Sequence, residues 1–112
     1  MSDPKDDFAK VLAAASADFR RHLPQKIEDI VRLWADLVRD GATPEKLEEL
    51  VRATHTIAGS ARVFGLAEAS HAARALEQYL DTFAHAPAVD DESARAQTES
   101  LINALRQSVT SK

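Results

Sequence analysis

The chain has 112 residues, a formal net charge of −4 and no cysteine, which favours one domain without disulfides or thiolate metal sites. Because the 18 acidic residues outnumber the 14 Lys and Arg residues, a general nucleic-acid-binding surface is not expected. No apolar run approaches the roughly 18 residues of a membrane-spanning helix, and the N-terminus lacks the features of a secretion signal. We therefore expect a cytoplasmic protein without a membrane segment.

Two helices are expected in the first forty residues, over 4–22 and 24–40. Asp3 can cap the first of them, with Pro4 at its first position. Pro24 removes a backbone hydrogen bond and clashes with the preceding turn, so we predict a break or kink between the two helices. Apolar residues at helical spacing mark both segments: Phe8, Leu12, Ala15, Phe19 and Leu23, then Ile27, Ile30, Val31, Trp34, Leu37 and Val38.

Three further helices are expected over 44–63, 66–84 and 90–109. Thr43 followed by Pro44 is typical of a helix start. Each segment carries an apolar stripe with steps of three and four residues. The stripes consist of Leu47, Leu50, Val51, Thr54, Ile57 and Ala61; of Leu66, Ala69, Ala73, Leu76, Leu80 and Phe83; and of Ala94, Leu101, Ile102, Leu105 and Val109.

The whole chain, residues 1–112, is expected to form a single all-α domain, because no strand pattern or internal repeat is present. Short connections, including a loop predicted at 85–88, favour antiparallel neighbours. The predicted fold is an up-and-down four-helix bundle. The additional N-terminal helix over 4–22 is expected to pack across one end of this bundle, and the protein is expected to be a monomer.

The stretch from His55 to Gly65 is the most informative part of the sequence. A glycine inside a helix costs about 1 kcal/mol relative to alanine, and Gly59 lies one turn after His55. At about 100° per residue, Arg52, Gly59 and Arg62 share the solvent face of the helix with His55. This arrangement predicts an accessible imidazole with an open approach and cations that favour an anion such as a phosphoryl group. A neutral imidazole can act as a nucleophile, so His55 is a candidate phosphoryl acceptor.

A resemblance to a known family follows from these residues. The sequence His-Thr-Ile-Ala-Gly-Ser-Ala at 55–61, followed by Phe-Gly-Leu at 64–66, resembles the signature of histidine-containing phosphotransfer (HPt) domains. The phospho-accepting domain of chemotaxis histidine kinases shares this signature. The likeness extends to 76–80 (Leu-Glu-Gln-Tyr-Leu) and to the stretch from Phe19 to Pro24. It therefore covers most of the chain and implies a four-helix bundle.

The resemblance also implies roles for four residues. His55 would accept the phosphoryl group through Nε2. Gly59 matches a small residue that leaves space for an incoming receiver domain, and Ser60 matches a small residue often found after it. Glu77 matches a carboxylate that hydrogen-bonds the other ring nitrogen and fixes the tautomer. Two alternatives stay open, since Glu77 could be an ordinary solvated helix residue and Ser60 a helix-packing residue.

One position departs from the family pattern. The family usually has a lysine three residues after the histidine, where this chain has Ala58. That lysine is thought to help hold the phosphoryl group, so its loss puts the rate or stability of phosphorylation in question. Arg62, one turn further along the same face, is the candidate replacement. Arg52, Thr56 and Val63 are the expected contacts for a docking partner.

The implied function is that of a phosphorelay intermediary. His55 would take a phosphoryl group from an aspartate in a receiver domain of a hybrid histidine kinase and pass it to the receiver domain of a response regulator. The receiver domain would supply Mg²⁺, and this chain is expected to bind no cofactor or metal. Because no glycine-rich nucleotide loop is present, we expect a carrier with no ATP site and no autokinase activity.

Two other classes of function stay open. One is a helical adaptor or structural bundle that binds signalling partners and in which His55 is incidental. The other is a metal-binding bundle, which would need inward-facing carboxylates combined with Glu-x-x-His spacing. The remaining histidines are interpreted as surface residues: His22, His71 and His85.

Overall fold

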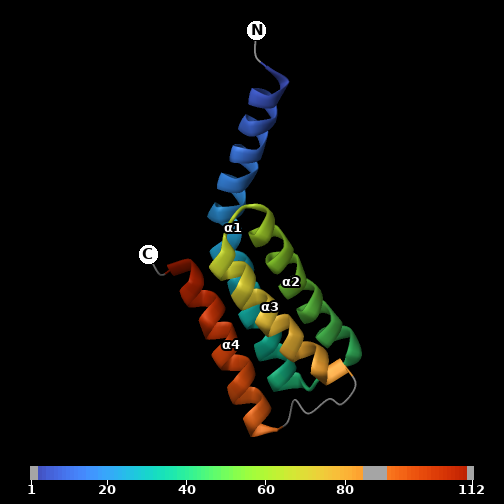
Figure 1. Ribbon diagram of the computed structural model, residues 1–112. Coiled ribbons are helices and arrows are strands. Elements are labelled where there is room, and N and C mark those ends of the chain that lie inside the picture. Colours follow the sequence, from blue (N-terminus) through green and yellow to red (C-terminus); the bar gives the residue numbers. More distant parts are fainter. Residues whose placement is uncertain (1–2, 85–90, 111–112) are drawn as a thin grey trace.

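The computed structural model describes residues 3–84 and 91–110, and this part of the chain consists of four α-helices and one short 3-10 helix. Successive helices run in opposite directions along one long axis (Figure 1). The predicted all-α, up-and-down four-helix bundle is therefore confirmed. The elements are α1 (Pro4–Asp40), α2 (Pro44–Val63), α3 (Ala67–Asp81), the 3-10 turn η1 (Thr82–Ala84) and α4 (Glu92–Thr110).

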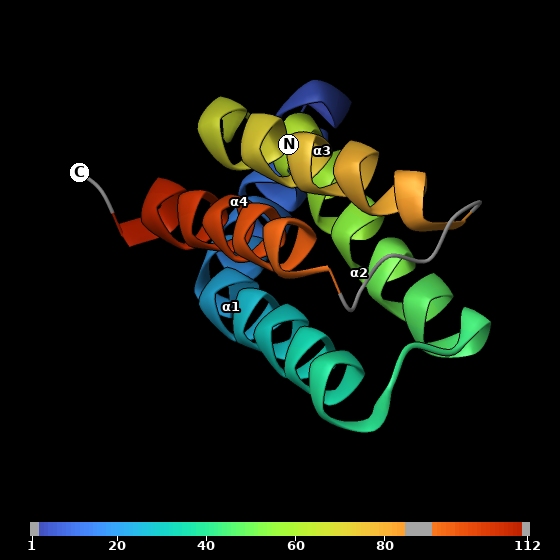
Figure 2. The same ribbon diagram turned by 90° about the horizontal axis from the view of Figure 1, so that it is seen from below.

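The four helices surround one apolar core. Helix α2 packs most extensively on α3, and α1 and α4 complete the bundle, so that each helix has two neighbours (Figure 2). Because the buried positions recur every three or four residues, each helix turns one continuous stripe inward. Fully buried residues from all four helices meet in this core: Leu23, Ile27, Ile30, Leu37, Leu50, Leu76, Leu80 and Leu105.

Helix α1 runs unbroken through Pro24, so the predicted division into two helices over 4–22 and 24–40 is wrong. Pro24 has no backbone amide hydrogen, so the carbonyl group of Arg20, four residues earlier, has no donor within the helix. Both residues lie on the exposed side of α1, where water can solvate this carbonyl group. Leu23 and Ile27 flank the proline in sequence and are each only 2% exposed. Their shared packing on the bundle holds both sides of the proline in one helix.

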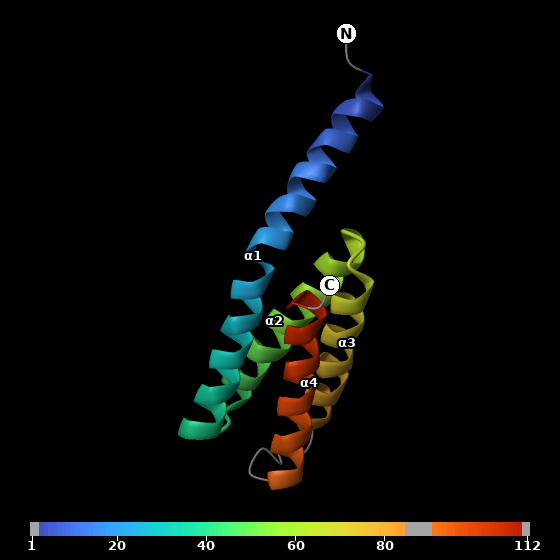
Figure 3. The ribbon, with the colours of Figure 1, turned by 90° about the vertical axis from the view of Figure 1, so that its left-hand side faces the viewer.

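The N-terminal half of α1 projects beyond the bundle, as Figure 3 shows. The expectation that this segment packs across one end of the bundle is therefore wrong, because a continuous helix cannot fold back. Phe8, Val11 and Leu12 remain 68%, 67% and 41% exposed. Burial begins at Phe19, whose ring lies 5.3 Å from that of Phe64 at the α2–α3 turn.

Side chains cap the N-termini of three helices, including the two caps expected at Asp3 and Thr43. Asp3, Thr43 and Asp91 accept hydrogen bonds from backbone amides in the first turns of α1, α2 and α4, respectively. Gly65 adopts a positive φ of 75° in the turn that joins α2 to α3, a conformation that favours glycine. The predicted loop at 85–88 and the predicted start of the last helix at position 90 lie outside the described residues.

None of the described helices is both long enough and apolar enough to cross a bilayer. Helix α1 has sufficient length, but charged residues occur along it.

Candidate functional site

His55 lies in the middle of α2 with its side chain 71% exposed. The prediction that it faces solvent is therefore confirmed. Its neighbour Thr54 is fully buried and donates a hydrogen bond of 2.8 Å to the backbone oxygen of Leu50. Ile57 is also buried, at 2% exposure. These residues fix the inner face of α2, so the helix holds the imidazole on the outer face.

The imidazole of His55 contacts a carboxylate from the next helix. Nδ1 of His55 lies 2.6 Å from Oε2 of Glu77, although the two residues are 22 positions apart. Glu77 is on α3, and its side chain is only 19% exposed. Because a carboxylate accepts, Nδ1 donates the hydrogen, and the neutral ring then carries its free lone pair on Nε2. The arrangement presents a nucleophilic nitrogen to solvent.

A second hydrogen bond joins α2 and α3 at Ala58. Ala58 is 3% exposed and faces the core. Its backbone oxygen accepts a hydrogen bond of 2.9 Å from the hydroxyl group of Ser70 on α3. Position 58, where the family usually has lysine, is therefore occupied here by a packing residue. Any cation at this site must come from another position.

Gly59 leaves an open surface one turn after His55. It is exposed, and a Cβ atom added to it would meet no heavy atom within 4 Å. Packing within the chain therefore does not require glycine at this position. Ser60 beside it is half-buried, and its backbone oxygen accepts from the amide of Phe64 at 3.0 Å. The missing side chain at Gly59 relieves no clash within the chain, but it leaves the surface open to whatever approaches from outside.

The other residues predicted for docking share the exposed surface of α2. Val63 is 69% exposed, and Thr56 is exposed, with its hydroxyl group 3.0 Å from the backbone oxygen of Arg52. Arg52 is paired with Glu48 at 2.7 Å. These residues are all accessible to a partner, and in the described part of the chain none of them forms a hydrogen bond or ion pair with the imidazole.

Sequence reasoning did not single out Arg74, which lies near the site. Arg62 on α2 and Arg74 on α3 line one shallow depression together with Ser70 and His71. Both arginines are exposed. Its spacing from Glu77, three residues, places Arg74 on the same side of α3, but its closeness to Arg62 depends on how α2 and α3 are aligned.

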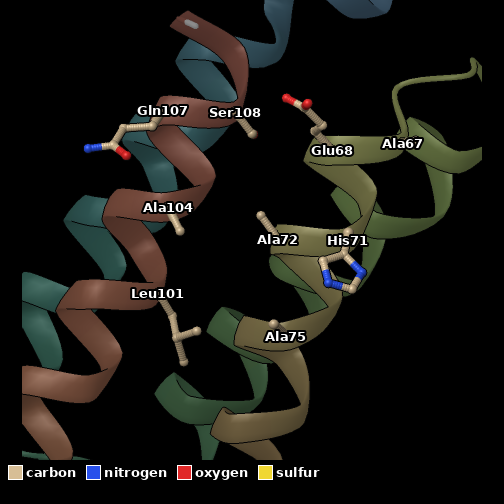
Figure 4. Close-up of a pocket in the computed structure, with 9 residues that line it drawn as sticks. All are labelled: Ala67, Glu68, His71, Ala72, Ala75, Leu101, Ala104, Gln107 and Ser108. Carbon is tan, nitrogen blue, oxygen red and sulfur yellow. The ribbon is translucent and has the colours of Figure 1, made fainter.

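A larger open groove lies between α3 and α4, away from His55. Small side chains line most of it, and Figure 4 shows Ala72 pointing toward α4 while the ring of His71 is turned away. Glu68 and His71 on α3 have Glu-x-x-His spacing, but both are exposed. Across residues 3–84 and 91–110, no group of three or more His, Asp or Glu residues is arranged to hold a metal ion. The groove offers no inward-facing metal site of the kind a bundle requires.

Residues 15–108 match the family described as Hpt domain. The chain belongs to the Hpt domain family. As an Hpt domain it functions in phosphorelay histidine phosphotransfer, and domains of this family interact with receiver domains. The family resemblance predicted from the stretch at 55–66 is thereby confirmed.

The Hpt domain is also similar to a curated protein, Protein RcaC of Microchaete diplosiphon. The two are 29% identical over 80 residues, which cover 69% of this chain and 12% of RcaC. The Hpt domain thus corresponds to a small part of that relative. No solved structure matches the chain.

Proposed function

We propose that His55 is the phospho-accepting residue of this Hpt domain and that the protein carries phosphoryl groups between two receiver domains. The observation that carries the proposal is the exposed imidazole whose Nδ1 contacts Glu77 at 2.6 Å. In the neutral ring, that contact places the hydrogen on Nδ1 and the free lone pair on Nε2. An accessible nucleophile oriented by a carboxylate is the arrangement that nucleophilic catalysis requires.

The proposed transfer is an in-line displacement at phosphorus. Nε2 of His55 attacks the phosphorus atom of an aspartyl phosphate, the P–N bond forms, and the bond to the aspartate oxygen breaks, releasing the carboxylate. Positive charge develops on the ring, and the carboxylate of Glu77 stabilises it through Nδ1–H. Transfer to the second receiver domain reverses these steps. The receiver domain contributes Mg²⁺ and most of the electrostatic stabilisation, since phosphoryl transfer depends chiefly on positioning and charge.

The proposed docking surface surrounds His55 on α2. The missing side chain at Gly59 allows a partner backbone to approach, and Arg52, Thr56 and Val63 supply polar and apolar contacts. Such a small surface suits a transient complex that must release its partner after transfer. We assign the two partners to a hybrid histidine kinase and a response regulator, and the acting form to a cytoplasmic monomer.

A phosphotransfer assay tests the proposal. The purified protein is mixed with phosphorylated receiver domains from its own cell, and the labelled product is treated with acid and with base. We expect an acid-labile, base-stable phosphate on the wild-type protein and none on His55→Gln. His22→Gln, which replaces another exposed histidine, should be labelled normally. Undiminished labelling of His55→Gln would overturn the assignment, and receiver binding without any phosphate on the wild type would favour an adaptor.

A further inference from the structure

The shallow depression beside the site brings together three basic side chains from two helices. Arg62 comes from the last turn of α2, whereas His71 and Arg74 come from α3. All three are exposed, so their nitrogen atoms are available to a partner. Ser70 also lines the depression, but its hydroxyl group is already bonded to the backbone oxygen of Ala58. The depression therefore presents two guanidinium groups and one imidazole.

These arginines differ from most arginines of α1, where Arg20 is the exception that also forms no ion pair within the described residues. Arg21, Arg32 and Arg39 on α1 each pair with an aspartate of the same helix. Arg62 and Arg74 form no ion pair within residues 3–84 and 91–110. In a protein with a net charge of −4, free cations concentrated in one place form a local positive field.

The depression lies next to His55 and not over it. Arg62 follows His55 by seven residues, a rise of about 10 Å along α2. Arg74 precedes Glu77 by three residues on α3, and Glu77 contacts the ring of His55. His55 does not line the depression, and within the described residues no hydrogen bond or ion pair joins it to Arg62, so the geometry does not support the predicted role of Arg62 in holding the phosphoryl group. A group bound there would belong to a partner that also covers the imidazole.

We propose that Arg62, His71 and Arg74 form a recognition site for a carboxylate side chain of the receiver domain that docks on His55. This inference rests on the proposed function. The planar fork of a guanidinium group matches a carboxylate in a bidentate geometry, and two such forks in one depression select an acidic partner. The negative net charge of the chain disfavours nucleic acid as the ligand.

The test compares two double variants with equal changes in net charge. Arg62→Ala with Arg74→Ala removes the free cations, and Arg21→Ala with Arg32→Ala removes exposed arginines that are paired on α1. The probe is the phosphorylated receiver domain that labels the wild type fastest. We expect the first variant to raise KM about tenfold with little change in kcat, and to weaken the dependence of KM on sodium chloride. The control variant should behave like the wild type.

Chemical phosphorylation separates this inference from the proposed function. Phosphoramidate transfers its phosphoryl group to histidine without a protein partner, so both double variants should be labelled at His55 like the wild type. Failure of the wild type to accept phosphate from any receiver domain would overturn the proposed function. Normal transfer to the wild type with an unchanged KM for the Arg62 and Arg74 variant would overturn the recognition site alone.

Two further outcomes would also overturn the recognition site. Slower labelling by phosphoramidate in the Arg62 and Arg74 variant would show that these residues act on the imidazole itself. Binding of a fluorescent DNA duplex to the wild type, lost in this variant, would assign the depression to nucleic acid. Circular dichroism of both variants establishes that the helices are intact before KM values are compared.

Discussion

His55 and His22 look alike in isolation but sit in different surroundings. Both side chains are largely exposed, at 71% and 55%, and both have Nδ1 near a carboxylate. For His55 the carboxylate belongs to Glu77 on another helix, at 2.6 Å. For His22 it belongs to Asp18 on the same helix, at 3.5 Å. Proximity to a carboxylate is therefore not what distinguishes the candidate acceptor.

The difference lies in how firmly each carboxylate is held. Asp18 is 59% exposed and also pairs with Arg21, while its backbone oxygen lies 2.8 Å from Nδ1 of His22. Glu77 is 19% exposed and lies on α3, the helix that packs most extensively on α2. Exposed ion pairs contribute little because water competes for both partners. A carboxylate held by packing orients an imidazole far better than one held by its own helix turn.

The largest expected difference in phosphotransfer rate is between variants that remove one or the other carboxylate. Glu77→Ala should lower the rate of phosphotransfer to His55 by about 10- to 100-fold, because the ring loses the group that fixes its tautomer. Asp18→Ala should leave the rate unchanged. Rapid-quench measurement of labelling from a phosphorylated receiver domain provides both rates. Equal rates for the two variants would show that Glu77 does not orient the ring of His55.

The next largest effect on the transfer rate is expected from the residue one turn after each histidine. Gly59 follows His55 and Lys26 follows His22. Gly59→Lys makes the two surroundings alike and should lower transfer from a receiver domain about tenfold, since a partner can no longer approach closely. Labelling by phosphoramidate should not change, because the small donor needs no such space. A loss of both activities would instead indicate damage to the imidazole itself.

Gly59→Ala separates folding from docking at the same position. Because a Cβ atom here meets nothing within 4 Å, alanine should raise the free energy of unfolding by about 1 kcal/mol through its better helix propensity. Transfer from a receiver domain should fall by a smaller factor than in Gly59→Lys. Urea denaturation gives the stability. A less stable alanine variant would show that glycine serves the fold.

Pro24→Ala should have no effect on transfer and an effect on stability alone. The proline lies two residues after His22 and far along the chain from His55. Alanine restores an amide donor within α1, and a proline inside a helix costs up to about 3 kcal/mol relative to alanine. We expect a higher unfolding temperature with unchanged phosphotransfer. A change in transfer rate would mean that α1 influences the site through the bundle.

The sequence predicted the bundle and the exposed face of His55 because both follow from helical periodicity. Leu50 and Ile57 are seven residues apart on α2, which places them on one face of a helix, and Leu76 belongs to the apolar stripe of α3. The structure buries all three. The helix break predicted at Pro24 does not occur, because Leu23 and Ile27 continue their packing across the proline. Periodicity places residues on faces but carries no information about which faces meet.

For the candidate site, too, the sequence does not show which helix faces meet. The position of Glu77 could be inferred only from the family resemblance, since its contact with His55 depends on the register between α2 and α3. That register involves Ser70 and the backbone oxygen of Ala58, a contact with no signature in the sequence. Arg74 was missed for this reason, because its closeness to Arg62 exists only once the two helices are aligned.

The contact between Glu77 and His55 spans two helices, so neither helix alone specifies the reactivity of the imidazole. A peptide consisting of α2 would retain His55 and Gly59, yet both ring nitrogens would be hydrated and the two neutral tautomers would interconvert freely. Folding of α3 against α2 selects one tautomer. The tertiary structure of this protein therefore determines which of two chemically similar nitrogen atoms is free to react.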